Sequence, residues 1–279
     1  MKKKRNVKSV IAKVVVIVLV ALLLFWFDFP LFWMFLSSFK APQEIYTLPP
    51  VFLFEPTLAN YSEMIFRRGV LRFFSNSLLT AGISTLIALI LGSLAGYALA
   101  RGRIPGKQDI AFWMITTRMA PIAVVLLPFF LIFLSLHILY TLPALIIAYI
   151  SFNLPFAAWL LWGFFETVPS EIEEAGLCDG CSKFEVFRRI ALPLVTPGLA
   201  TTGILCFMFA WNDYMFASVF TSQQTATLPV IASSYMAGHR AVPWGQVTAT
   251  GSFLFIPVLI GGILIRRYLV TGLTMGAIK

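Results

Sequence analysis

Charged side chains are scarce in this sequence, because Asp, Glu, Lys and Arg make up only 12% of its 279 residues. A soluble domain carries about 25% charge, so about half of the usual polar surface chemistry is missing. Among the charged residues the acidic ones are fewer, with 12 Asp and Glu against 21 Lys and Arg. Hydrophobic residues account for 59% of the chain, and the mean hydropathy is +0.88. These values exclude a soluble domain and indicate a chain that lies in a lipid bilayer.

Histidine and cysteine are also few, at two and three residues. Cys178 and Cys181 form a C-x-x-C pair, but a structural zinc site needs four ligands, and Cys206, His137 and His239 cannot complete one. We expect the pair to be free thiols. No phosphate-binding G-x-x-x-x-G-K-[ST] motif and no cluster of catalytic groups occurs. We therefore expect no catalytic residue, no metal and no cofactor in this chain.

Long apolar runs are abundant, and each is near or above the roughly 20 residues that a membrane-spanning helix needs. They are continuous rather than alternating, which favours helices over barrel strands. The first run is too long for the apolar part of a signal peptide and lacks a cleavage pattern. We expect an all-α membrane protein, one domain over residues 1–279. Its six expected transmembrane helices are Val10–Leu36, Phe73–Ala100, Ile110–Leu136, Leu142–Phe165, Gly198–Phe220 and Val247–Ile265.

Basic residues show which side of the membrane each connection occupies. Most of them flank the two termini and the connections near residues 101–107 and 167–195. The positive-inside rule therefore predicts that both termini and residues 167–195 are cytoplasmic, with residues 37–72 and 221–246 outside. The net charge of +9 is then a topology signal that requires no nucleic acid, although the basic N-terminus is also suited to anionic lipid.

The cytoplasmic stretch 167–195 is the most polar part of the chain between two spans. Ser170 with Glu173, and Ser182 with Glu185, each match the capping box that begins a helix. Between them, Asp179-Gly180 offers a glycine that can adopt positive φ and reverse the chain. The pattern predicts two short helices around a glycine turn.

The second short helix is amphipathic in the sequence. Phe184, Phe187 and Ala191 form an apolar stripe, backed by Lys183 and the basic pair 188–189. Such a helix displayed in the cytoplasm favours docking into the groove of a partner. The alternative is that Glu171, Glu173, Glu174 and Glu185 are only the solvated face of a loop.

The stretch resembles the EAA loop of ATP-binding-cassette importer permeases, in which a coupling helix seats in a cleft of the ATPase subunit. Gly176 stands where that family usually has a second alanine, and we expect this exchange to loosen the helix slightly. Pro197 also matches the EAA-loop pattern of that family. The matching positions, which are the expected ATPase-coupling residues, are Glu174, Ala175, Gly176, Asp179, Gly180, Phe184, Phe187, Ile190, Leu192 and Pro193.

Further motifs resemble the carbohydrate (MalG-like) branch of that family. They cover nearly the whole chain: Ser38-Phe39-Lys40, Asn60-Tyr61, Asn76-Ser77, Trp211-Asn212-Asp213 and the C-terminal Gly272–Lys279. The resemblance implies a non-catalytic subunit of a bacterial or archaeal inner membrane, forming half of the path for a sugar or sugar-like solute. The implied partners are a different sibling permease, two ATPase subunits that hold ATP and Mg, and an extracytoplasmic solute-binding protein. The tail after Arg267 would reach into the ATPase dimer.

Polar residues inside or beside the spans are the candidates for the solute path. Arg118 is a full charge within a span and should face the bundle interior or water. It is suited either to a hydroxyl or anionic group of the solute or to a carboxylate of a neighbouring subunit. The aromatic, amide and carboxylate groups near residue 212 suit a sugar, but they also suit hydrogen bonds between helices. The candidates are Arg118, Asn153, Trp211, Asn212, Asp213 and Tyr214.

An ion-coupled secondary transporter of small polar solutes is the alternative function. Such a protein is expected to place paired carboxylates or unwound glycine-rich helices at the membrane midplane. Acidic residues are nearly missing from the inner half of these spans, which disfavours this alternative. The class of solute stays open among disaccharides, polyols, sulfonated sugars and glycerol phosphodiesters.

Overall fold

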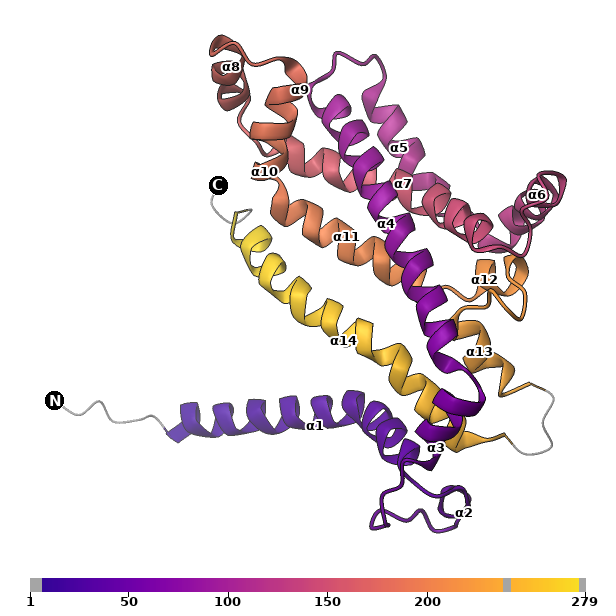
Figure 1. Cartoon of the computed structure of the whole chain (residues 1–279). Coiled ribbons are helices and arrows are strands. Elements are labelled where there is room, and N and C mark those ends of the chain that lie inside the picture. The colour runs from indigo at the N-terminus through magenta and orange to yellow at the C-terminus, as the bar shows by residue number, and fades with distance from the viewer. Residues whose placement is uncertain (1–6, 238–241, 276–279) are drawn as a thin grey trace. The chain divides into compact units, whose positions relative to one another are not determined.

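The computed structural model describes residues 7–237 and 242–275, with side chains for residues 13–237 and 242–264. Every regular element within those ranges is helical (Figure 1). Four helices are long and apolar enough to cross a membrane: α1 (Val7–Ser38), α4 (Val70–Arg101), α7 (Leu142–Glu166) and α14 (Trp244–Met275). The expected all-α membrane fold is confirmed. His239, the basic residues before position 7 and the C-terminal residues 276–279, which figured in the sequence analysis, lie outside the described residues.

Two bent helix pairs bring the number of candidate spans among the described residues to as many as six, if each pair counts as one span. The first joins α5 (Lys107–Thr117) to α6 (Ile122–Ser135) at an angle of 90°. Pro121 lies in this bend, and its missing N–H and fixed φ do not support a continuous helix there. The sequence predicts one span over Ile110–Leu136, and in the structure this stretch consists of two helices that meet at the bend.

The second bent pair joins the helical stretch Lys183–Leu194 to α11 (Thr196–Trp211) at 76°. The predicted helix Gly198–Phe220 also stops early, because α11 ends at Trp211 and a separate α12 (Met215–Phe220) follows. The Asp213 carboxylate accepts a hydrogen bond from the Ala217 backbone N–H at 3.1 Å. It thereby satisfies one of the free donors at the start of α12.

The described chain forms two compact units, and the first comprises the chain up to Gly69 together with Tyr235–Phe253. Besides α1 and the first part of α14, it contains α2 (Pro42–Ile45), α3 (Ala59–Ser62) and η1 (Glu63–Arg67). The apolar window of α1 is exposed throughout. A helix that is hydrophobic all round and unburied needs lipid or another apolar surface as its solvent.

Asn60 organises the polar part of the first unit. Its side-chain amide donates to the carbonyls of Ser38, at 2.9 Å, and Lys40, at 2.8 Å. The Ser38 and Tyr61 hydroxyls are 2.8 Å apart and share a hydrogen bond. The Lys40 ammonium lies 4.3 Å from the centre of the Trp33 ring, a cation–π contact. Two of the motifs noted in the sequence, near residues 38–40 and 60–61, therefore bind one another.

The second unit comprises Val70–Ser234 and the chain from Leu254, and its core is the packing of α4 against α7, with α11 beside them (Figure 1). Two glycines of α4 allow its backbone to approach α7 closely. A Cβ at Gly92 would lie 2.8 Å from the Ala157 Cβ, and one at Gly96 would lie 2.8 Å from the Trp162 backbone nitrogen. Small residues at helix contacts are the usual means of tight packing in membranes.

The other end of α4 holds the connection that leads to α13 (Leu228–Ser234). The Asn76 amide donates to the carbonyls of Gln224, at 3.2 Å, and Ala226, at 3.0 Å. The Ser77 hydroxyl accepts from the Leu228 N–H at 2.8 Å. The Asn76-Ser77 motif thus anchors a segment about 150 residues further along the chain.

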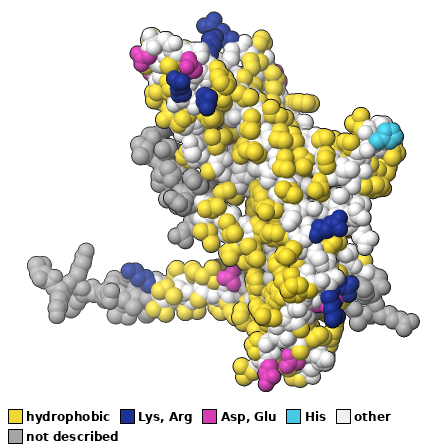
Figure 2. Space-filling model, in the orientation of Figure 1, with side chains coloured by type: hydrophobic (Ala, Val, Ile, Leu, Met, Phe, Trp, Pro, Cys, Tyr) yellow, Lys and Arg dark blue, Asp and Glu magenta, His cyan; other side chains and the backbone are white. Residues whose placement is uncertain are grey.

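Hydrophobic side chains cover most of the visible length of these helices (Figure 2). Lysine, arginine and acidic side chains gather at the end that carries α8 (Ser170–Cys178) and α9 (Lys183–Val186). This polar end contains residues 167–195, which we call the coupling loop.

Candidate functional site: the coupling loop and the membrane cavity

The coupling loop contains the two helices and the glycine turn that the sequence predicts. α8 ends at Cys178, and Gly180 has φ of +89°, a conformation that favours glycine. The Cys181 N–H returns to the Gly176 carbonyl at 3.1 Å. The loop then re-enters the helical conformation at Lys183. This tight reversal places α8 beside the stretch that follows it.

Ser182 caps the second helix as predicted. Its hydroxyl accepts from the Glu185 N–H at 3.3 Å, and the Glu185 carboxylate accepts from the Ser182 N–H at 3.0 Å. These bonds to the backbone and hydroxyl of Ser182 lower the pKa of Glu185 below its usual range. The helix continues beyond α9 as η2 (Phe187–Ala191) and α10 (Leu192–Leu194).

The predicted capping box at Ser170 is wrong. α8 begins at Ser170 itself, with Pro169 in the N-cap position and without a side-chain cap. The Glu173 side chain instead turns inward and is 5% exposed. Its Oε1 accepts from Arg101 Nε at 2.9 Å and its Oε2 from the Tyr97 hydroxyl at 2.7 Å. The other acidic residues of the stretch differ, since Glu171 and Glu174 are exposed.

Arg101 completes this cluster, because its Nη2 lies 2.8 Å from Glu173 Oε1 and also donates to the Val168 carbonyl at 2.6 Å. The Tyr97 ring packs 5.0 Å from the Phe187 ring, centre to centre. We call Tyr97, Arg101 and Glu173 the latch. It ties the coupling loop to the end of α4 through a charge-assisted pair that is largely removed from water.

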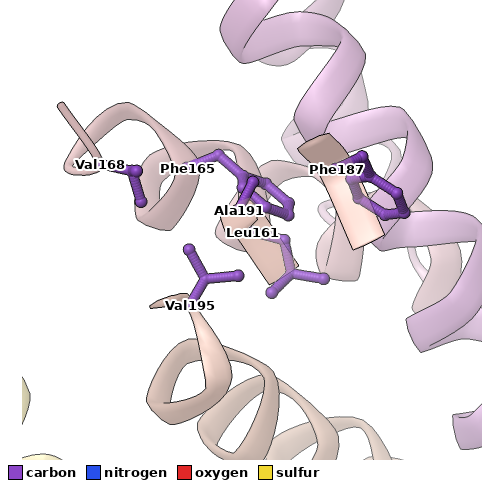
Figure 3. Packing of buried hydrophobic residues seen from close by; sticks show 6 residues of the cluster. All are labelled: Leu161, Phe165, Val168, Phe187, Ala191 and Val195. Atoms are coloured by element: carbon purple, nitrogen blue, oxygen red, sulfur yellow. The ribbon is translucent and has the colours of Figure 1, made fainter. Parts of the chain in front are cut away.

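The apolar stripe of the second helix faces its own bundle rather than a partner. Phe187 and Ala191 are buried in a cluster with Leu161, Phe165, Val168 and Val195 (Figure 3). Phe184, the remaining member, is 63% exposed. The prediction that all three residues form one docking face was therefore wrong, because periodicity identifies a face but not what covers it.

Gly176 has a packing role that the sequence did not reveal. A Cβ at this position would collide with the Ile190 Cδ1 atom. Gly176 is buried and Ile190 half-buried, so the missing methyl makes room for the isoleucine that joins the two arms of the loop. The sequence prediction of a slightly loosened helix did not include this contact.

The outer surface of the coupling loop is both apolar and charged. Glu174, Ala175, Asp179 and Pro193 are exposed, and Leu192 is half-buried. Three large apolar side chains accompany them in the open: Ile172 at 45%, Leu177 at 43% and Phe184 at 63% exposure. Exposed large apolar side chains of this kind are typical of a protein contact when they adjoin one another.

A cavity of about 500 Å³ lies in the second unit where α5, α7, α11 and α12 meet. Five of the six expected solute-path residues line it: Arg118, Asn153, Asn212, Asp213 and Tyr214. Trp211 does not. It is buried, and its indole N–H donates to the Leu254 carbonyl at 3.0 Å. Of the two interpretations left open by the sequence, Trp211 follows the one in which it joins neighbouring helices.

Asp213 and Asn153 are partly engaged by the protein. The Asp213 carboxylate accepts from the Tyr149 hydroxyl at 3.1 Å as well as from the N-terminus of α12. The Asn153 amide donates to the Cys206 carbonyl at 3.1 Å, and its Oδ1 is buried without a partner. Tyr149 was missed in the sequence because a tyrosine inside an apolar run gives no local sign of its partner.

Arg118 follows the last residue of α5 and lies among aromatic rings. Its guanidinium carbon is 4.0 Å from the ring centre of Phe209, 4.4 Å from that of Phe156 and 4.9 Å from that of Phe152. Its Nη1 atom is buried without a hydrogen-bond partner. Arg118 therefore faces the bundle interior, as its charge requires.

Tyr97 and Arg101 were also missed by sequence reasoning. Both lie in the last turns of α4, where a basic residue at a helix end already has an explanation from topology and the macrodipole. Only the folded chain shows that they meet a residue more than 70 positions away. In the described residues no group of three or more His, Cys, Asp or Glu is arranged to hold a metal.

The sequence comparisons identify the class of protein. Residues 88–274 match the model of the family described as "Binding-protein-dependent transport system inner membrane component". This match covers more than half of the chain, including the coupling loop and the cavity. The chain belongs to this family and is a membrane permease subunit of a binding-protein-dependent ATP-binding-cassette importer. The ion-coupled alternative finds no support.

Particular relatives agree over most of their length. The chain is 33% identical over 255 residues to the trehalose/maltose transport system permease protein MalG of Thermococcus litoralis, covering 90% of this chain and 91% of that one. It is 34% identical over 254 residues to the sulfoquinovosyl glycerol transport system permease protein SmoH of Agrobacterium fabrum, covering 90% and 88%.

A solved structure has the same fold. A chain from the crystal structure of a bacterial ABC transporter involved in the import of the acidic polysaccharide alginate matches with a TM-score of 0.80. The sequence identity is 21%, and the match covers 96% of this chain and 99% of that chain.

Proposed function

We propose that this permease pairs with a different sibling permease to form the membrane path for a sugar or sugar-like solute. In this proposal two cytoplasmic ATPase subunits bind ATP and Mg, and an extracytoplasmic binding protein delivers the solute. The observation that carries the proposal is the coupling loop, whose outer face is open while its inner face is tied to α4 by a buried ion pair. Such a loop is built to receive a force from a partner and pass it inward.

The outer face has the chemistry of a docking surface. Ile172, Leu177 and Phe184 supply apolar area, and Glu174 supplies a charge that can pair with a basic side chain of the ATPase. A surface made of these residues is costly to leave in water. Burial in a cleft of the ATPase would remove that cost and seat the loop.

The latch explains how movement of the loop would reach the bundle. A force on α8 would be transmitted through Glu173, which accepts hydrogen bonds from both Arg101 and Tyr97 at the end of α4. α4 is also the main partner of α7 in the core, through the close contacts at Gly92 and Gly96. A rigid connection of this kind favours movement of the helices as one body, which is the usual form of alternating access.

The solute proposal rests on the cavity and on the relatives. Amide, carboxylate, hydroxyl and guanidinium groups line the cavity together with the aromatic rings of Phe152 and Phe209. Aromatic faces with a few polar groups suit polyhydroxylated solutes. The relatives named above belong to a trehalose/maltose transport system in one case and to a sulfoquinovosyl glycerol transport system in the other, and all of these solutes are sugars or sugar derivatives.

The proposed orientation follows from the basic residues. The coupling loop, at the polar end of the second unit, itself contains Lys183, Arg188 and Arg189. The positive-inside rule assigns this end to the cytoplasm, where the ATPase subunits are. With six spans, both termini then lie on the same side, in a bacterial or archaeal inner membrane.

Purification of the tagged chain from its native membrane in mild detergent tests the proposal. We expect an ATPase and a second permease to co-purify, and the binding protein with a solute to stimulate ATP hydrolysis. The panel comprises disaccharides, polyols, sulfonated sugars and glycerol phosphodiesters. A chain that is recovered intact but without an ATPase would refute the proposal.

A charge reversal at Glu174 tests the docking surface directly. Glu174→Lys should leave the chain inserted but uncouple ATP hydrolysis from solute uptake, because the new charge opposes the basic cleft proposed for the ATPase. Asp109→Lys is the matched control, since Asp109 is exposed outside the coupling loop. Uptake at the wild-type level by the Glu174→Lys variant would remove Glu174 from the docking surface.

A further inference from the structure

Arg118 is half-buried in the cavity wall and carries a positive charge that the described part of the protein does not neutralise. Among the described residues, no carboxylate lies within ion-pair distance of it. Three phenylalanine rings lie 4.0–4.9 Å from its guanidinium carbon, and its Nη1 has no hydrogen-bond partner. Cation–π contacts reduce the cost of burying a charge, but they leave the N–H donors unused.

The same cavity holds an unused acceptor. Asn153 is 2% exposed and lines the cavity, and its Oδ1 has no partner while its amide group is fixed by the Cys206 carbonyl. Asp213, the cavity's carboxylate, already accepts from the Tyr149 hydroxyl and the Ala217 N–H. The cavity therefore combines an unpaired cation, an unpaired acceptor and a carboxylate that is engaged elsewhere.

We propose that Arg118 binds the anionic group of an acidic carbohydrate, either a carboxylate, a sulfonate or a phosphate, during transport. An oxyanion would accept from the guanidinium, and a hydroxyl of the same solute would donate to Asn153. The apolar faces of Phe152 and Phe209 would contact the sugar ring. A cavity of about 500 Å³ is large enough for a sugar of one or two rings.

A carboxylate from the sibling permease is the competing partner for Arg118. It would neutralise the guanidinium, but an ionised carboxylate has no proton to donate, so the Asn153 Oδ1 would stay unpaired. A solute that carries both an anion and hydroxyls satisfies both groups at once. The two unpaired groups together therefore favour the solute.

The experiment uses the complete transporter, reconstituted in liposomes with its binding protein, because the inference rests on the proposed function. The solutes are matched pairs that differ in charge: digalacturonate and its methyl ester, 6-sulfoglucose and glucose, and glucose 6-phosphate and glucose. Wild type, Arg118→Lys and Arg118→Gln are compared. Arg72→Gln is the control, since Arg72 is exposed and lies outside the cavity.

We expect the wild type to transport the charged member of at least one pair in preference to its neutral counterpart. Arg118→Gln should lower that transport roughly tenfold or more, as expected for loss of a charge-assisted hydrogen bond. Arg118→Lys should retain part of it, and Arg72→Gln all of it. The ATPase and the sibling permease should co-purify equally with every variant.

Transport of neutral solutes alone, or of none in the panel, would overturn the inference and leave the importer intact. An equal loss for both members of a pair in Arg118→Gln would also overturn it. Loss of the sibling permease from Arg118→Gln would assign Arg118 to the subunit interface instead. A wild-type preparation without an ATPase would refute the proposed function itself, which separates the two failures.

Discussion

Removal of the Glu173 carboxylate should release the coupling loop from α4. Glu173→Ala deletes both hydrogen bonds from Arg101 and Tyr97 and leaves the arginine without its counter-charge. Loss of one partner of a fully buried pair costs about 3–5 kcal/mol. The Arg101 side chain is 22% exposed, and it keeps its bond to the Val168 carbonyl. We therefore expect a cost near the lower end, about 3 kcal/mol.

This cost should appear as local opening rather than as global unfolding, since the loop is held to α4 mainly by the latch and by the cluster around Phe187. Amide hydrogen exchange in the purified transporter measures it. A loss of about 3 kcal/mol corresponds to an exchange rate on the order of 100-fold faster for the amides of residues 173–195. Solute uptake per ATP hydrolysed should fall in the same variant, because motion of the loop no longer reaches the bundle.

Two further variants are compared: one separates the charge of Glu173 from its shape, and the other is a control. Glu173→Gln keeps the side-chain volume and one acceptor oxygen for Arg101 but removes the charge and the second acceptor, so it should give a smaller acceleration of exchange than Glu173→Ala. Glu171→Ala removes an exposed carboxylate from the same helix and should leave exchange unchanged. Unchanged exchange and unchanged coupling in Glu173→Ala would refute the role of the latch.

Three other changes test separate parts of the structure. Gly180→Val should destabilise the coupling loop by about 1–3 kcal/mol because φ is +89° there, and normal recovery of the ATPase with this variant would contradict the turn. Ser182→Ala should cost about 1 kcal/mol by removing a helix cap, visible as faster exchange at residues 183–186 only; acceleration spread over the whole loop would contradict a local cap. Asn76→Leu should cost about 1–3 kcal/mol and expose residues 222–227 to limited proteolysis, and an unchanged digestion pattern would show that the loop is held by other contacts.

The spans could be predicted from the sequence because the signal is local. Each long apolar run must bury its backbone polar groups in a helix of its own. The bend at Pro121 could not be predicted with the same ease, since proline occurs in many membrane helices without breaking them. Likewise, the end of α11 at Trp211 and the bond from the Ala217 N–H to the Asp213 carboxylate at the start of α12 have no clear signal in this apolar stretch of the sequence.

In the coupling loop, too, features that depend on neighbouring residues could be predicted, whereas contacts between distant residues could not. Ser182 with Glu185 and the glycine turn follow from neighbouring residues, and both were predicted correctly. Glu173 fits the capping pattern equally well, but its partners Tyr97 and Arg101 come from another helix and compete successfully for its carboxylate. Local rules do not include such partners, so the latch could not be found in the sequence.

The residues of the cavity were chosen from the sequence by their polarity, and most of them do line it. Which of these residues contact one another, and which other side chains surround them, could not be predicted. The rings that surround Arg118 come from α7 and α11, about 35 to 90 positions further along the chain. The pairing of Asp213 with Tyr149 similarly needs two helices to be side by side.

ATP-driven uptake into liposomes tests the central claim most directly. The chain is reconstituted alone or with its co-purifying permease and ATPase, and labelled solute and binding protein are supplied outside. We predict accumulation only for the complete complex with ATP and Mg at the ATPase side, and none for the chain alone under an imposed proton or sodium gradient. Accumulation by the chain alone, driven by an ion gradient and independent of ATP, would contradict the account.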